Sequence, residues 1–277
     1  MKYIMRTLRY WAKTKLGIYI RHFLNIYPAS MSLSYGEVSS DLFLWRDANV
    51  YDNYFNLNHL GPILNPNYTD NYKALLVIYG CDGIRLASQE FILEYGKANL
   101  VSINDIIPKN KKKKGGTFAI FHLANLKIMF DNQKICLAER GIACYKLKSD
   151  TSDFMSSVHG NSFAIACNPT TMAIRLIGCY QKKLHQYRCQ IDLSDSLYCE
   201  LVVVNFLTKP LVVCVYENCS DNKKKIKEFT MSPGGMITLD SRYDFDVNSI
   251  IEFESHLNFL RPLIFKHYTN HFDILHG

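Results

Sequence analysis

The chain has 277 residues, of which 48% are hydrophobic, 13% aromatic and 21% charged. This composition excludes a disordered chain, which lacks the apolar mass needed to offset its ordering entropy. With only 14 glycines and 8 prolines, the chain is also neither collagen-like nor of low complexity. A chain of this length lies near the size at which one hydrophobic core divides, so we expect two modules or one long β architecture.

The formal net charge is +7, from 32 Lys and Arg against 25 Asp and Glu, and it is unevenly placed. Six basic residues precede the first acidic residue, Glu37, which leaves 26 basic against 25 acidic residues in the rest of the chain. A nucleic-acid-binding protein usually carries its basic patch on the folded body. The near-neutral body therefore predicts no nucleic-acid partner.

Residues 1–30 are predicted to form a basic amphipathic helix that ends at Pro28. At about 100° per residue, its apolar side chains gather on one face and most of its basic side chains on the opposite face. The apolar face has Ile4, Leu8, Trp11, Ile18, Tyr19 and Ile26, and the basic face has Lys2, Arg6, Arg9 and Lys13. Because Arg21 interrupts the apolar run, the segment predicts neither a secretory signal nor a membrane-spanning helix.

Three interpretations of this segment remain open. The helix packs on the body with its basic face in water, or it lies in a membrane surface. On a membrane, Trp11 enters the interface while Lys2, Arg6, Arg9 and Lys13 meet anionic headgroups, and these five are the predicted membrane-binding residues. The third interpretation is an organellar transit peptide, which the lack of acidic residues suits and the scarcity of serine does not.

Nine cysteines form an odd set without a C-x-x-C pair. Structural zinc sites normally use such pairs, so the sequence predicts no metal site, and no motif predicts a cofactor. Several cysteines lie in strand-like apolar runs, such as Val213-Cys214-Val215, where a free thiol behaves as a small buried hydrophobe. We therefore expect reduced thiols in a cytoplasmic protein. Peripheral attachment to a membrane is compatible with this location.

From Ser32 onward the hydrophobic pattern becomes strand-like. Apolar, β-branched and aromatic runs recur between Gly, Pro, Asn and Asp, without helical patterns between them. This excludes alternating βαβ units, and neither G-x-G-x-x-G nor a P-loop motif occurs. The prediction is a mainly β fold with one or two antiparallel β-sandwich units, jelly-roll or Ig-like, behind the N-terminal helix.

A weak internal sequence repeat, called the echo below, suggests that the two halves of the body are related. Phe91–Gly96 and Phe229–Gly234 both match F-x-[LM]-x-x-G, and each lies between a strand-like run that precedes it and another that follows. The echo predicts two β-sandwich units, residues 31–135 and 136–277. The lysine runs Lys109–Lys114 and Lys223–Lys227 are then expected to be exposed connections.

Four residues are candidates for a loop-borne catalytic site: His122, His159, Asn161 and His276. His159-Gly160-Asn161 stands at a break between strand-like runs, where one loop can present a ring and an amide, although a simple turn explains the same residues. The His267-x-x-x-His271 spacing would suit a metal only on a helix, and its surroundings look extended. No paired-carboxylate or G-x-S-x-G signature is present.

The leading functional hypothesis is a non-enzymatic binding or scaffold module that recognises carbohydrate or glycolipid at a membrane surface. It depends on an analogy with β-sandwich faces, on which spare Tyr and Trp rings stack against sugars. One alternative is an enzyme that acts on a saccharide or related polar substrate through the four candidate residues. The other is a structural assembly protein held together by sheet edges.

Overall fold

The protein is represented by a computed structural model that describes residues 11, 16–17, 20, 37–64, 67–97, 99–123, 141–149, 155–160, 163–178, 180–189, 192–219, 222–257 and 260–277. The described body is mainly β, as the sequence predicts, and its strand pairs are antiparallel. Two short helices interrupt it, α3 (Leu60–Leu64) and α4 (Ile103–Ile106), with a 3-10 turn at Lys109–Lys111. The predicted N-terminal helix falls almost wholly outside these residues.

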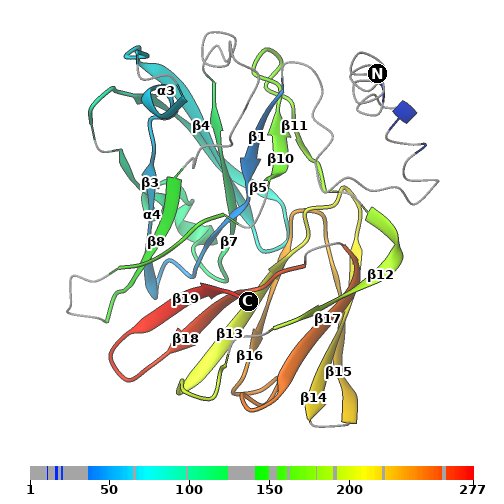
Figure 1. Cartoon of the computed structure of the whole chain (residues 1–277). Helices are drawn as coiled ribbons and strands as arrows, with labels where there is room; N and C mark the ends of the chain where they lie inside the picture. The colour runs from blue at the N-terminus through cyan, green and yellow to red at the C-terminus, as the bar shows by residue number, and fades with distance from the viewer. Residues whose placement is uncertain are drawn as a thin grey trace.

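In the described part of the chain, nineteen strands form five separate sheets; Figure 1 labels most of the strands. Sheet A has β1 (Val38–Asp41), β10 (Phe163–Cys167) and β11 (Ile174–Leu176). Sheet B has β2 (Phe43–Trp45), β7 (Gly116–His122), β4 (Tyr72–Gly80) and β5 (Arg85–Leu93), and sheet C has β6 (Leu100–Ser102), β3 (Tyr51–Leu57), β8 (Gly141–Leu147) and β9 (Ser156–Val158). Sheet D has β12 (Tyr180–Arg188), β17 (Ile250–Leu257), β14 (Leu211–Cys219) and β15 (Asn222–Met231), and sheet E has β16 (Met236–Asp240), β13 (Tyr198–Val204), β18 (Leu263–His267) and β19 (Phe272–His276).

The sheets are set as five blades in a propeller-like ring, so the predicted jelly-roll or Ig-like sandwich arrangement is wrong. The physical reason lies in sheet E, which is buried on both faces. Leu201 and Val203 of β13 pack in a core shared with sheet D, whereas Val202 and Val204 pack in the larger core shared with sheets A, B and C. A stand-alone two-layer sandwich would leave one face of this sheet in water.

The chain does not complete one blade before it starts the next, and its strand order repeats. Sheets B and C run β2-β7-β4-β5 and β6-β3-β8-β9, and sheets D and E run β12-β17-β14-β15 and β16-β13-β18-β19. Each label in the second pair is ten higher than its counterpart. We call β2–β9 the first half and β12–β19 the second half; β8 lies beyond residue 135 and pairs with β3 of the first half.

The sequence echo falls on equivalent places in this repeat. Leu93, at the end of β5, pairs with the first residue of β4, and Met231, at the end of β15, pairs with the first residue of β14. The glycine that follows each hairpin adopts a left-handed backbone, with φ of 72° at Gly96 and 71° at Gly234. Glycine is favoured there because a Cβ penalises positive φ. The motif therefore marks the same turn in both halves.

The run Lys223–Lys227 is part of β15 and not a connection, which corrects the sequence prediction. β15 lies at the outer edge of sheet D, paired with β14. Lysines along an edge strand discourage pairing with another chain, so this run protects the outer edge of sheet D from such pairing.

The turn of the β4–β5 hairpin joins the two halves. The amide of Met236, at the start of β16, donates a hydrogen bond to the carbonyl oxygen of Cys81 at 2.9 Å. Gly83 in the same turn has φ of 78°, and a Cβ on it would lie 2.0 Å from the carbonyl oxygen of Pro233. Only glycine allows this approach of two backbones.

A buried ion network crosses the same junction. The Arg46 guanidinium, after β2, lies 2.6 Å from an oxygen of Glu200 on β13, and the same oxygen lies 2.9 Å from Nε2 of His267 on β18. The guanidinium also stacks over the ring of Phe265 at 4.4 Å. The halves are thus held by charge as well as by apolar packing.

Candidate functional site

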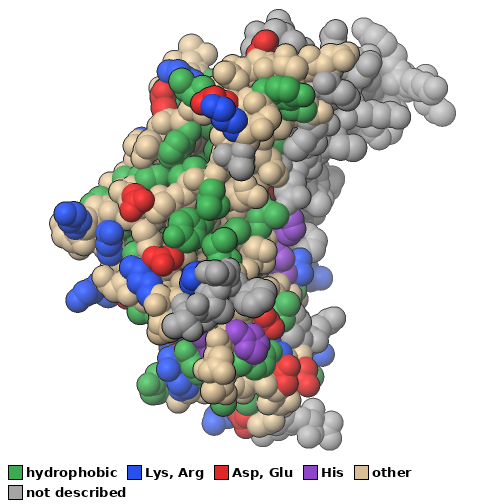
Figure 2. Space-filling model, turned by 90° about the vertical axis from the view of Figure 1, so that its left-hand side faces the viewer, with side chains coloured by type: hydrophobic (Ala, Val, Ile, Leu, Met, Phe, Trp, Pro, Cys, Tyr) green, Lys and Arg blue, Asp and Glu red, His purple; other side chains and the backbone are tan. Residues whose placement is uncertain are grey.

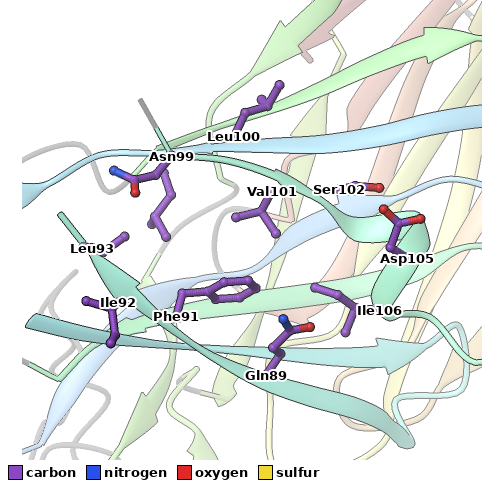
Figure 3. A pocket seen from close by; sticks show the side chains of 11 residues that line it. Gln89, Phe91, Ile92, Leu93, Asn99, Leu100, Val101, Ser102, Asp105 and Ile106 are labelled. Carbon is purple, nitrogen blue, oxygen red and sulfur yellow. The ribbon is translucent and has the colours of Figure 1, made fainter. Parts of the chain in front are cut away.

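A groove of about 380 Å³ opens between β5 and β6, and we take it as the candidate site (Figure 3). β5 is the last strand of sheet B and β6 is the first strand of sheet C. Within the described residues, β5 pairs only with β4 and β6 only with β3. Each strand therefore has one edge whose backbone groups are not used in a sheet, and such edges are templates for another strand.

Apolar side chains from both strands and from α4 line the groove. Figure 3 shows the Phe91 ring lying between Val101 and Gln89, with Ile106 of α4 beside it. The remaining lining residues are Leu57, Ile92, Leu93, Asn99, Leu100, Ser102 and Asp105. The lining thus combines aliphatic side chains and one aromatic ring with four polar side chains, those of Gln89, Asn99, Ser102 and Asp105.

A buried amide pair fixes α4 at the end of the groove. Asn53 on β3 donates from Nδ2 to Oδ1 of Asn104 at 2.7 Å, and Asn104 donates to the carbonyl oxygen of Tyr51 at 2.9 Å. Both amides are buried, so losing either would leave a polar group without its partner. This pair holds the neighbouring Asp105 and Ile106 at the groove.

The rim of the groove exposes large aliphatic side chains to solvent. Ile92 is 65% exposed and Leu100 is 54% exposed. Figure 2, which views the molecule from the left of Figure 1, shows a gathering of hydrophobic side chains over the middle of this face. A contiguous exposed apolar patch beside free strand edges is typical of a protein-interaction surface.

The charges near the groove are mainly compensated. Glu90 lies 2.9 Å from Lys73, and Glu94 is paired with Lys97. Asp105 makes no ion pair within the described residues, which leaves one carboxylate at the groove for a basic group of a ligand.

His122 lies in the core. It lies on β7 and is buried, with Nδ1 3.0 Å from the hydroxyl oxygen of Tyr72. That hydroxyl also accepts a hydrogen bond from the Leu60 amide at 2.7 Å, which ties β4 to α3. His122 therefore serves the packing of sheet B.

The structure places His159 and His276 near each other. Burial, with the charges of Arg261 and His159, lowers the pKa of His276 to about 4. His276 Nδ1 is buried and has no hydrogen-bond partner among the described residues. Asn161 lies outside those residues, and neither histidine lines the groove. No group of three or more potential metal ligands occurs in the described part of the chain.

The predicted membrane-binding residues cannot be placed in the same way. Lys2, Arg6, Arg9 and Lys13 lie outside the described residues, and Trp11 is described with an exposed side chain. No helix in the described ranges is long and apolar enough to cross a bilayer. Membrane-surface binding by this segment stays a prediction.

Comparison with known proteins identifies no relative: no protein-family model, no curated protein and no solved structure matches the chain. Sequence reasoning also missed the groove, although the two edge strands carried a signal. β15 carries Lys223, Lys224, Lys225 and Lys227, whereas β5 carries Arg85 and Glu90, and Ile92 of β5 stands where β15 has Thr230. An edge strand with fewer charges and an exposed isoleucine is less protected against pairing, which favours a binding edge.

Proposed function

We propose that the chain is a non-catalytic binding module whose β5–β6 groove holds an extended apolar segment of a polypeptide. The observation that carries the proposal is the pair of free strand edges beside an apolar groove with Ile92 and Leu100 exposed at its rim. An added strand gains backbone hydrogen bonds from an edge, and its alternate side chains enter pockets. A basic residue in the segment would pair with Asp105.

Carbohydrate or glycolipid is the weaker candidate ligand. Of the two tryptophans, Trp45 is fully buried and donates its ring N–H to the carbonyl oxygen of Tyr79, so it cannot stack on a sugar. The groove offers one aromatic ring, Phe91, among mainly aliphatic side chains. The single ring gives little stacking surface for a sugar, whereas the two strand edges suit an extended polypeptide.

A catalytic function has less support than binding. The His159–His276 pair lies apart from the groove lining, and no group of three or more potential metal ligands occurs in the described part of the chain. A proton-transfer site needs a substrate position within hydrogen-bond reach of its base. The cytoplasmic location is proposed with the binding function, on the six described cysteines that carry free thiols.

Selection of peptides from a random 12-residue library displayed on phage tests the proposal. We expect the purified protein to enrich peptides with alternating apolar residues and a basic residue. The Ile92→Lys/Leu100→Lys variant should bind these peptides at least about 100-fold more weakly, because it loses two apolar contacts of roughly 1.5 kcal/mol or more each. Both side chains are exposed, so the fold should survive the changes.

Leu197→Lys provides the matched control, since Leu197 is 68% exposed and lies outside the groove. This variant should bind the peptides as the unaltered protein does. Equal loss in both variants, or no enrichment of peptides, would contradict the proposal. The carbohydrate function would replace the proposal if the protein bound glycans on an array, the double variant did not, and no peptide bound.

A further inference from the structure

The repeat of the fold allows the surroundings of this groove to be compared with the equivalent place in the second half. Resting on the proposed function, we propose that the occupant is the turn end of the β14–β15 hairpin of a second copy of this chain. The copies would then associate head to tail.

The chain contains an internal precedent for this contact. The β4–β5 turn of the first half packs on the connection between β15 and β16 of the second half. A Cβ on Gly234 in that connection would lie 3.6 Å from Gly83 of the turn, and the Met236 amide donates to Cys81. Met236, the first residue of β16, is only 7% exposed as a result.

No described residue covers the equivalent place in the first half. Gly96 corresponds to Gly234, but a Cβ on Gly96 would meet no described atom within 4 Å. Leu100 is the first residue of β6, which pairs with the end of β3, and Met236 is the first residue of β16, which pairs with the end of β13. The two residues therefore correspond, yet Leu100 is 54% exposed. Tyr95, next to Gly96, is exposed as well. The first half therefore has the same binding surface without its hairpin turn.

The counterpart of the β4–β5 turn is the turn of β14–β15. The described ends of β14 and β15 on either side of this turn lie far from the groove of their own chain. β5 has nine residues and spans roughly 27 Å at 3.3 Å per residue. One end of β5 contacts the second half, so the groove lies near its far end. Figure 1 shows β14 and β15 extending to the opposite end of the molecule. Different surfaces at opposite ends produce head-to-tail association.

The charges of the two surfaces are complementary. The turn end of β15 carries Lys223, Lys224 and Lys225, and Lys224 makes no ion pair within the described residues. The groove offers Asp105, which also lacks an ion pair there. The run Lys109–Lys114 lies at the junction of the halves, where a Cβ on Gly115 would be 3.2 Å from Met236. It is therefore near the other end of β5.

Complementation between two variants tests the proposal by sedimentation velocity at about 100 μM protein and low salt. Ile92→Lys/Leu100→Lys removes the groove and keeps the hairpin end. Lys224→Glu/Lys225→Glu removes the hairpin charge and keeps the groove. The unaltered protein should form species larger than a monomer, and each variant alone should be monomeric. Their equimolar mixture should form a dimer, because one intact surface remains on each partner.

Lys183→Glu, an exposed charge reversal on β12, is the control and should associate as the unaltered protein does. A monomeric unaltered protein at this concentration, or a mixture that stays monomeric while the unaltered protein associates, would overturn the inference. If the protein stays monomeric but selected peptides still bind through Ile92 and Leu100, this inference fails and the proposed function stands.

Discussion

Replacing Glu200 by Gln is expected to lower the free energy of unfolding by about 3 to 5 kcal/mol, because it removes one partner of a buried ion pair. The Glu200 carboxylate is the common partner of Arg46 and His267 at the junction of the halves. The side chain of Arg46 is only 9% exposed, so the guanidinium would be left without its counter-charge. Urea unfolding at pH 7 measures the loss.

The acid dependence of stability provides a second readout of the same group. Burial alone would raise the pKa of Glu200, but the hydrogen bond with His267 and the charge of Arg46 lower it to about 2. The pKa is lower in the folded than in the unfolded state, so the contribution is complete above about pH 4.5 and is lost as the pH falls towards 2. E200Q should lack this part of the acid sensitivity.

The control for Glu200 is the apolar replacement Arg46→Met/Glu200→Met. Replacing both members of a buried pair by apolar residues of similar size is often nearly neutral, so the double variant should be more stable than E200Q. A loss below about 1 kcal/mol in E200Q would show that the network contributes little to stability.

Gly83→Ala is expected to destabilise the protein by at least about 2 kcal/mol, and Gly96→Ala by about 1 kcal/mol. Both residues have positive φ, of 78° and 72°, so both substitutions carry the same conformational penalty. Only at Gly83 would the added Cβ also meet backbone, 2.0 Å from Pro233, because Gly96 faces open space. Urea unfolding of the two variants compares them, and equal losses would contradict the close packing of the junction.

Local features of the repeat could be predicted from the sequence. The F-x-[LM]-x-x-G echo identified the β4–β5 and β14–β15 hairpins, because the buried Leu93 and Met231 and the left-handed Gly96 and Gly234 constrain residue type locally. The strand-like apolar runs also predicted the mainly β class of the body. Such features depend on neighbours along the chain, which a single sequence displays.

The arrangement of the sheets could not be predicted, because it depends on contacts between distant segments. Buried residues follow one another along β13 and β18, and a run of this kind indicates burial without saying which sheets cover it. In β3, Asn53 takes a buried position in the alternating pattern, where Asn104 and Arg46 satisfy its amide. That pairing is not visible in sequence.

The candidate histidines show the same limit. A histidine in a sequence looks alike whether it is buried beside a tyrosine, as His122 is, or placed near another histidine, as His276 is. The groove could not be recognised from the sequence, because only the pairing of the strands shows that β5 and β6 each lie at the edge of a sheet. Once the two strands are known to be equivalent, Ile92 of β5 can be compared with Thr230 of β15, and β5 is the more apolar strand at this position.

Photo-crosslinking from the rim of the groove tests the central claim most directly. A benzophenone amino acid replaces Leu100 in the purified protein, and position 197 carries it in the control. The account predicts covalent dimers from position 100, joined to peptides of a second chain that contain Lys223–Lys225, and none from position 197. An absence of dimers from position 100, or crosslinks spread over unrelated segments, would contradict it.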